Sequence, residues 1–466
     1  MNRQNIKNYI IEWIDKNKQN FTDAADRIFD NPELGMQEFY AVSVLQELLV
    51  KYGFTVETGV AEMPTAFIAT FGSGNPVAAF NCEYDALPGL SQKRSANEAP
   101  VIYGAPGHGC GHNLLGTGSI CAAVALKEAM EKFNFSAAIK VIGSPAEEMC
   151  IGKTFIARAG LLDGIDFFMD WHPSFSNSIS SNSSAYFNTY YHFKGKTAHG
   201  NSPWNGRSAL DAAMLMGHAA EMLREHVPPG KEGGENTWNY TFSDVGPEFP
   251  SIVPDRTTAW YVGRFTTTDI MEDFMERLDK CAEGAAIATG TSVSKELVTA
   301  IHERIPNSAI SKIMHDNYNE IGALSFTSEE IQFCNTVAKN GGLKAEGIAG
   351  DVMPLEEGYS AVTDVSEFTW FAPTASACIA LAPNVGVHNW MMTAFSGTTT
   401  GKKALLHAGK LMAVSCVDLV TEPALITEIK TEHAQRTQGK VYKSLIKGLK
   451  PALDINKQTM ERYRKI

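Results

Sequence analysis

Short apolar runs alternate with helix-patterned segments along most of this chain, and this alternation constrains the fold more than any other feature. Strand-like runs occupy residues 65–72, 76–85, 137–145, 166–173 and 376–383. Apolar residues recur at helical spacing over 4–18, 36–52, 114–133, 152–162 and 402–420. The pattern predicts an α/β fold with a mostly parallel sheet and helices on both faces.

The pattern changes between residues 184 and 304. Strand, helix, strand, strand, helix and strand are predicted there, at 185–199, 208–226, 235–246, 257–267, 269–290 and 293–304. This order is typical of an α+β unit of the ferredoxin-like kind. Because 466 residues exceed what one core accommodates, we predict a first domain made of 1–183 and 305–466, with a polar helical tail after residue 424, and an inserted domain at 184–304.

The bulk composition excludes several classes of partner. Asp and Glu number 52 against 40 Lys and Arg, a net charge of -12, and no basic cluster stands out. This argues against nucleic acid or an anionic membrane surface as the partner. The N-terminal residues have no leader pattern, no run of 18 apolar residues occurs, and the eight cysteines are sparse. We therefore expect a cytoplasmic protein with reduced thiols.

The segment 107-GHGCGHNLLGTG-118 admits three interpretations. A phosphate-binding glycine loop is rejected, because His112 and Cys121 stand where its third glycine would be. A cysteine nucleophile is possible, since His108 and His112 flank Cys110 and could lower its pKa. A metal site is also possible: in an extended loop Cys110 and His112 would face the same way, and a thiolate with an imidazole suits zinc or a similar ion.

Further candidate ligands follow other predicted strands. Glu147 and Glu148 lie in 145-PAEE-148, His172 in Trp171-His172-Pro173, and His388 in 384-NVGVHNW-390. The carboxyl ends of parallel strands are where such sheets place their sites. Adjacent side chains point in different directions, so one glutamate can bind a metal while the other acts as a general base.

These motifs resemble those of the M20 family of metallopeptidases and amidohydrolases, in the branch with a Cys-x-His pair. The similar segments are GHGCGHN, PAEE, DWHP, KTAHGNSP, 83-EYDALPGL-90 and 363-TDVSEFTWFAPTA-375. The resemblance implies a catalytic domain with two divalent ions, Zn or Mn, and an inserted lid that dimerises. It also implies hydrolysis of an N-acyl or N-aroyl amino acid, such as one like p-aminobenzoyl-glutamate, or of a dipeptide. The partner would be a second copy or an A-type subunit.

The resemblance also implies roles for individual residues. Cys110 would bridge two metals, and the other ligands would be His112, Glu148, His172 and His388. Glu147 would be the general base, Asp85 would orient a ligand, and His199 of the lid would stabilise the oxyanion in a partner's site. Arg264 is a candidate clamp for a substrate carboxylate.

Two positions depart from the family pattern, and two other classes of function stay open. Ser251 and the pair Ala361-Val362 occur where the family grips the substrate's carboxylate end, so they bear on specificity. The alternatives are a hydrolase or transferase with Cys110 as nucleophile, and a non-catalytic partner subunit. Removal of metal with a chelator should inactivate a metal enzyme and leave an enzyme that uses Cys110 as nucleophile active.

Overall fold

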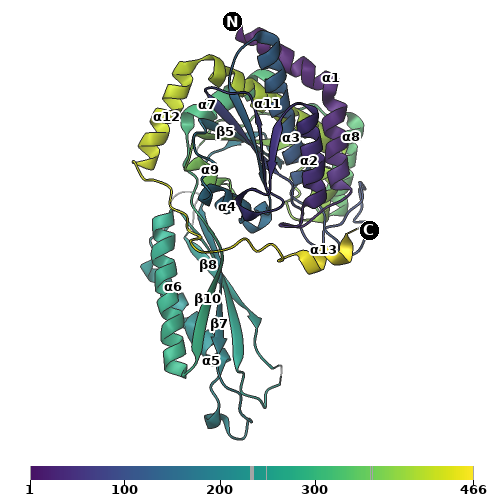
Figure 1. Cartoon of the computed structure of the whole chain (residues 1–466). Helices are drawn as coiled ribbons and strands as arrows, with labels where there is room; N and C mark the ends of the chain where they lie inside the picture. The colour runs from purple at the N-terminus through teal and green to yellow at the C-terminus, as the bar shows by residue number, and fades with distance from the viewer. Residues whose placement is uncertain (1, 231–235, 248, 357, 359, 465–466) are drawn as a thin grey trace.

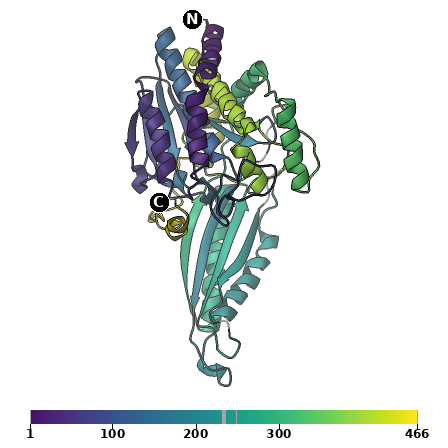
Figure 2. The ribbon, with the colours of Figure 1, turned by 90° about the vertical axis from the view of Figure 1, so that its right-hand side faces the viewer.

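The computed structural model describes residues 2–230, 236–247, 249–356, 358 and 360–464. The chain forms two parts, which Figures 1 and 2 show as a broad upper part and a narrow lower one. We call the upper part the body; it contains a seven-stranded sheet. The lower part, the lid, contains a four-stranded sheet.

The body sheet has the order β1-β2-β4-β3-β5-β11-β6. Its strands are β1 (Thr55–Thr58), β2 (Phe67–Phe71), β3 (Val77–Glu83), β4 (Ala138–Ser144), β5 (Phe167–Ser174), β6 (Ser178–Ser180) and β11 (Thr374–Ala380). The central pairs β4–β3, β3–β5 and β5–β11 are parallel, whereas the outer pairs are antiparallel. The central strands are buried on both faces, as parallel strands generally are. The predicted parallel sheet is thus confirmed, with antiparallel edges.

Helices cover both faces of the body sheet, as predicted. One face packs against α1 (Arg3–Phe29), α2 (Phe39–Lys51), α3 (His112–Phe133), α7 (Ser308–Ile321) and α11 (Thr399–Thr421). The other face packs against α4 (Gly152–Arg158) and α9 (Ser366–Thr369). The remaining helices are α8 (Ser328–Asn340), α10 (Trp390–Ser396), α12 (Pro423–Thr437) and α13 (Lys457–Tyr463).

Two glycines let α3 lie close to the sheet. A Cβ on Gly116 would stand 2.5 Å from the carbonyl oxygen of Glu83, and one on Gly118 would stand 2.9 Å from Nε1 of Trp171. Larger residues at these positions would push the helix away from β3 and β5. The close packing places His112, the first residue of α3, at the carboxyl ends of these strands.

One helix of the described residues, α11, has the length and hydropathy that a membrane span requires. Its most apolar 18-residue stretch has a mean hydropathy of 1.4, and 72% of that stretch is buried. It contacts α1, α3 and α7 in the body. Burial on this scale identifies α11 as a core helix of the body.

The lid has the β-α-β-β-α-β order that the sequence predicts. Its elements are β7 (Ala185–Lys194), α5 (Ala209–Met222), β8 (Thr237–Asp244), β9 (Arg256–Phe265), α6 (Thr268–Thr289) and β10 (Ser292–Ile301). The sheet order β10-β7-β9-β8 with all pairs antiparallel is that of a ferredoxin-like unit. Both helices pack on one face around Phe187, Trp238 and Phe274. The first residue predicted for β8, Glu235, lies outside the described residues.

The polar C-terminal tail is helical only in part, which corrects the prediction. Helix α12 ends at Thr437, and residues 438–456 form an extended strap that leads to α13 (Figure 1). Side chains hold this strap, since Tyr442 donates a hydrogen bond to Glu367 at 2.7 Å and Nη1 of Arg158 donates to the carbonyl of Leu449 at 2.6 Å. These bonds replace the regular backbone bonds that a helix would have.

Candidate metal centre

Cys110 and His112 lie together, but not in the extended loop that their spacing suggested. Gly111 has a left-handed backbone with φ 81° and caps α3, a conformation that glycine adopts without strain. The turn at Gly111 brings Sγ of Cys110 and the ring of His112 into one donor group. The expected proximity is therefore present, and the sharp turn before the helix is its cause.

A second turn carries the two adjacent glutamates. Strand β4 ends at Ser144, and Ala146 has a left-handed φ of 56° at the start of a short 3-10 helix, Glu147–Met149. A left-handed alanine costs about 1 kcal/mol or more. The turn sends the two side chains apart: Oε2 of Glu147 lies 3.7 Å from Nε2 of His112, whereas Oε2 of Glu148 lies 3.3 Å from Nε2 of His388.

Three groups of donor atoms lie together at the carboxyl ends of β3, β4 and β5. Within each group, the donor atoms are within 4.8 Å of one another. The groups are Cys110 with His112 and His172, Cys110 with Glu148 and His388, and Glu83 with His112 and Glu147. Cys110 belongs to two groups, so its sulfur lies between two places that could each hold an ion.

The ring orientation of two histidines is fixed by contacts on the far side of the ring. Nδ1 of His112 lies 2.8 Å from Oδ1 of Asp85, and Nδ1 of His172 lies 2.7 Å from the carbonyl oxygen of Pro173. Each Nδ1 therefore carries a proton, and each Nε2 faces the donor groups. Oδ2 of Asp85 also accepts a hydrogen bond from the backbone N–H of Glu148 at 3.0 Å.

His388 closes the cluster from a separate loop after β11. Its backbone N–H donates to the carbonyl oxygen of Gly109 at 3.0 Å, and its φ is 60°. This bond ties the loop of His388 to the loop of Cys110. The His388 side chain is 51% exposed, against 9% for Glu148. His388 thus lies at the open side of the cluster.

The donor atoms fit divalent metal ions. In the described part of the chain, Nε2 of His112 and Oε1 of Glu148 are buried without a hydrogen-bond partner. Buried polar atoms are normally paired, and an orphaned pair of acceptors in one cluster requires an explanation. Thiolate, imidazole and carboxylate ligands are those of zinc sites. Because His112 and Glu148 belong to different donor groups, one cation in each group would satisfy the two orphaned atoms.

Burial is the main influence on three acidic side chains of the cluster when no cation is bound. It raises the pKa of the Cys110 thiol, raises the pKa of Glu147 well above its usual range, and raises the pKa of Glu148 to about 7. A cysteine nucleophile requires a lowered pKa, so the nucleophile interpretation of Cys110 loses its support. A bound cation reverses this effect by favouring the deprotonated forms.

Sequence reasoning missed a buried ion-pair cluster behind the donor groups. Nζ of Lys153 lies 2.8 Å from Oε1 of Glu83 and 2.5 Å from Oδ1 of Asp364, and all three side chains are buried. Although burial opposes its ionisation, the ammonium of Lys153 together with His112 holds the pKa of Glu83 at about 2. Glu83 precedes Asp85 by two residues, so the strand period could have indicated that both lie on one side; Lys153 had no such signal.

The structure does not bring His199 or Arg264 into the donor groups. His199 is exposed on the lid loop after β7, where its Nδ1 accepts a hydrogen bond from the N–H of Asn201. Arg264 is exposed on β9, and the residue opposite it in the strand register is Tyr186, the second residue of β7. Because Phe265 faces the lid core, Arg264 points to the face without helices.

Two other residues singled out in the sequence also lie outside the donor groups. The carbonyl oxygen of Ser251 accepts a hydrogen bond from Gly200 N–H at 2.7 Å. His108 is buried outside all three donor groups.

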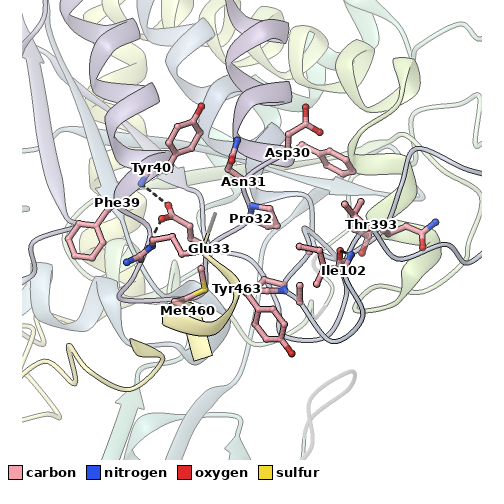
Figure 3. Close-up of a pocket in the computed structure, with 18 residues that line it drawn as sticks. Asp30, Asn31, Pro32, Glu33, Phe39, Tyr40, Ile102, Thr393, Met460 and Tyr463 are labelled. Atoms are coloured by element: carbon pink, nitrogen blue, oxygen red, sulfur yellow. Dashed lines mark hydrogen bonds and ion pairs between the residues drawn. The ribbon is translucent and has the colours of Figure 1, made fainter. Parts of the chain in front are cut away.

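A separate cavity of about 660 Å³ lies near the other end of the Cys110 loop. Its lining includes Phe29, Phe39, Ile102, Gly107 and Tyr463 (Figure 3). Figure 3 shows Glu33 held by the backbone N–H of Tyr40, at 2.7 Å. No residue of the donor groups lines this cavity, so the metal cluster and the cavity are distinct places.

Comparison with known proteins agrees with this geometry. The model of peptidase family M20/M25/M40 matches residues 79–367. The chain is 33% identical to the B-type subunit of p-aminobenzoyl-glutamate hydrolase of Escherichia coli (strain K12), over 94% of this chain and 97% of that protein. It is 26% identical to the Xaa-Arg dipeptidase of Mus musculus, over 93% of both proteins.

Solved structures share the fold. A dinuclear metal-binding peptidase of the M20 family from Bacillus subtilis superposes with a TM-score of 0.57 at 16% identity, covering 87% of this chain and 98% of that chain. The matched residues 79–367 include Asp85, Cys110, His112, the glutamate pair and His172. The protein is an M20 hydrolase: the chain belongs to peptidase family M20/M25/M40.

Proposed function

We propose that this M20 hydrolase uses two divalent ions, Zn or Mn, to cleave the amide bond of an N-acyl or N-aroyl amino acid or of a dipeptide. The observation that carries the proposal is the shared position of Cys110. Its sulfur belongs to one donor group with His112 and His172 and to another with Glu148 and His388. If both groups held an ion, the Cys110 thiolate would be available to each of them.

The chain's own residues have separate tasks in this reaction. Bound metal ions supply the positive charge that makes a water molecule acidic and polarises a carbonyl. Glu147 takes the proton from the water and returns it to the leaving nitrogen. Its carboxylate is suited to this task because it lies beside His112 but outside both groups that contain Cys110. Asp85 holds His112 in the orientation that exposes Nε2.

The substrate class rests on the relatives and on the lid. The Escherichia coli relative is named for p-aminobenzoyl-glutamate and the mouse relative for Xaa-Arg dipeptides; both substrates are amides that end in an amino acid carboxylate. Arg264, on the open face of the lid sheet, is our candidate for binding that carboxylate, since a guanidinium pairs with it through two hydrogen bonds. The mixed sulfur, nitrogen and oxygen donors favour Zn slightly over Mn.

A second copy of the chain is the partner that we propose, and the lid is the surface. Helix α5 exposes Met214, Leu215 and Met222, the last 72% exposed, and β8 is an edge strand of the lid sheet. An apolar stripe beside an unpaired strand edge is typical of an association surface. In such a dimer, His199 would reach the metal site of the other copy and stabilise the oxyanion. An A-type subunit is the alternative partner.

The test is a panel assay of purified protein in three states: metal-free, Zn-loaded and Mn-loaded. Substrates include p-aminobenzoyl-glutamate, N-acetyl amino acids and Xaa-Arg dipeptides. We expect metal-dependent release of the free amino acid from at least one substrate, with about two ions per chain by elemental analysis. Activity that survives chelation would instead support Cys110 as a nucleophile, and full metal loading without any turnover would support a non-catalytic partner subunit.

A further inference from the structure

A continuous line of buried polar side chains leads from the two chain segments that join lid and body to the metal cluster. The incoming segment follows β6 and reaches β7 at Ala185, and the outgoing segment leaves β10 after Ile301. We call these segments the connectors. Any change in lid orientation must bend both connectors, because within the described residues the backbone passes between the two parts at these two segments.

Arg304 joins the connectors to each other. Its backbone N–H donates to the carbonyl oxygen of Ser183 at 3.1 Å, and Nη1 of its guanidinium lies 3.4 Å from Oγ of Ser180. Arg304 therefore sits on the outgoing connector and holds the incoming one. The residue is only 4% exposed, so this contact lies in the interior.

From Arg304 the line continues across the body sheet. Nη2 of Arg304 donates to Oγ of Ser376 on β11, and this hydroxyl donates to Oδ2 of Asp170 on β5 at 2.5 Å. Nδ2 of Asn81, on β3, donates to Oδ1 of Asp170 and to Oε1 of Glu83, both at 2.8 Å. The bonds from Ser376 to Asp170 and from Asn81 to Asp170 thus join β11 to β5 and β5 to β3, and the bond from Asn81 to Glu83 continues along β3.

The line ends at a metal ligand. Oε2 of Glu83 lies 3.4 Å from Nε2 of His112, the ring nitrogen that faces the donor groups. Lys153 fixes the other oxygen of Glu83 from the opposite side, at 2.8 Å. Glu83 therefore cannot rotate freely, and its position depends on Asn81 and Lys153. Ser376, Asp170, Asn81 and Glu83 are all buried, which strengthens such links and makes a broken one costly.

We propose that Arg304 is a positioning residue that couples the orientation of the lid to the geometry of His112 through Ser376, Asp170, Asn81 and Glu83. A shift of the connectors moves the guanidinium, and the hydrogen bonds pass that shift to the carboxylate beside His112. The inference rests on the metal site of the proposed function, and it assigns a role to residues that the proposed function does not use. Because spatial contiguity alone does not demonstrate coupling, the test measures coupling directly.

The experiment compares Arg304→Met, Arg304→Lys and Ser376→Ala with the unaltered protein. Two quantities are measured: the dissociation constant for Zn²⁺, by competition with a chelator, and hydrogen exchange of metal-free protein in peptides covering 79–85. We expect Arg304→Met and Ser376→Ala to weaken Zn²⁺ binding by about tenfold, the lower end of the effect of removing groups that orient ligands. In the same two variants, hydrogen exchange over residues 79–85 should rise. Arg304→Lys keeps a positive charge and should retain part of the Zn²⁺ affinity and part of the protection from exchange.

A double-mutant cycle decides whether the residues act as one line. If they do, Arg304→Met combined with Asn81→Ala weakens Zn²⁺ binding no more than the stronger single variant, whereas independent effects would multiply. Arg158→Met is the matched control, because Arg158 fastens the strap through backbone carbonyls and has no contact with the line. It should leave Zn²⁺ binding unchanged.

Other outcomes would overturn the proposal. If Arg304→Met raised exchange only in the connectors and left 79–85 and Zn²⁺ binding unchanged, Arg304 would be a structural pin of the connectors. Should Arg304→Met fail to fold, Arg304→Met with Asp170→Asn removes both buried charges and allows the same measurements. Failure of the proposed function would appear as absent turnover in the panel assay, and the exchange measurement on metal-free protein does not depend on turnover.

Discussion

Nδ1 of His112 lies 2.8 Å from Oδ1 of Asp85, on the side of the ring opposite the donor groups. The same carboxylate accepts the backbone N–H of Glu148 through its other oxygen at 3.0 Å. Asp85 therefore sets the orientation of one candidate ligand and the position of a second. A carboxylate in this position acts on the metal through its ligands.

Asp85→Asn should weaken metal binding without unfolding the protein. The amide matches the carboxylate in size but cannot accept hydrogen bonds with both atoms, so either His112 or Glu148 loses its support. We expect about 10–100-fold weaker Zn²⁺ binding, measured by competition with a chelator. Unchanged affinity would mean that the two ligands hold their positions without Asp85.

Glu147→Gln should abolish most turnover and retain the metal. Loss of a general base typically lowers kcat by about 10²–10⁴-fold, and Glu147 is outside both groups that contain Cys110. Turnover and metal content are measured on one sample. Glu148→Gln is the matched control, in which metal content should fall; the reverse pattern would exchange the two roles.

Lys153→Met should destabilise the protein strongly. The ammonium pairs with Glu83 and Asp364 in the interior, and removal of one partner of a buried pair costs about 3–5 kcal/mol. Urea unfolding of the metal-free protein measures the loss. The double variant Lys153→Met with Asp364→Asn has one fewer buried charge than Lys153→Met alone. It should therefore recover part of the lost free energy of unfolding. Equal stability of the two variants would show that Asp364 is protonated in Lys153→Met, so that no unpaired charge remains there.

Glu38 should contribute a fall in the free energy of unfolding of the metal-free protein as the pH rises from about 5 to about 8. Burial raises the pKa of Glu38 to about 8, because its side chain is enclosed beside Asp85. A carboxyl with a raised folded pKa binds a proton that the unfolded chain has already released, so unfolding is favoured increasingly until the folded pKa is reached. The contribution is at most about 1.4 kcal/mol per pH unit.

Glu38→Gln isolates this contribution. The amide imitates the protonated acid and does not titrate, so the fall in unfolding free energy between pH 5 and pH 8 should become shallower than in the unaltered protein. Glu47→Gln, on the exposed side of α2, should leave the slope unchanged. An identical slope in Glu38→Gln would mean that Glu38 is ionised in the folded protein.

A mixture of two inactive variants tests whether His199 acts in a partner's site. If Glu147→Gln and His199→Ala are refolded together, half of the dimers are mixed, and each mixed dimer has one site with both residues intact. Activity should return to roughly a quarter of the unaltered value for a two-fold symmetric dimer. No recovery above the sum of the separate variants would assign His199 to its own chain or to no catalytic role.

The elements that could be predicted from the sequence are those in which apolar residues recur at a regular spacing. Strands β3, β4, β5 and β11 are short apolar runs, and α3 has apolar residues at helical spacing. The end of α1 was predicted at residue 18, but it continues to Phe29. Polar residues such as Asn20 and Asp23 obscure the period there, whereas Phe21, Ala25 and Ile28 continue the buried stripe. The strap has no regular spacing of apolar residues. Hydrogen bonds with side chains of distant segments hold it in place.

Part of the donor groups was predictable, because Glu148 comes soon after β4, His172 lies near the end of β5 and parallel strands end at one edge. The contact between Lys153 and Asp364 was not, since 211 residues separate them and neither residue type indicates a buried partner. The turn at Gly111 also escaped prediction, because a spacing of two residues does not reveal a left-handed backbone. Local patterns thus indicate where side chains gather, and long-range pairing decides which of them meet.

The order of the ligands along the chain has a consequence for biosynthesis. Cys110, His112, Glu148 and His172 precede the lid, whereas His388 follows it, together with β11, the neighbour of β5. On the ribosome, domains emerge from the N-terminal end first. The donor group of Cys110, His112 and His172 is therefore translated long before the group that includes His388 is complete. A nascent chain that has not yet emerged past residue 388 has the donor group of Cys110, His112 and His172, whereas the group with Glu148 and His388 is complete only after the lid has been made and the chain has returned to the body.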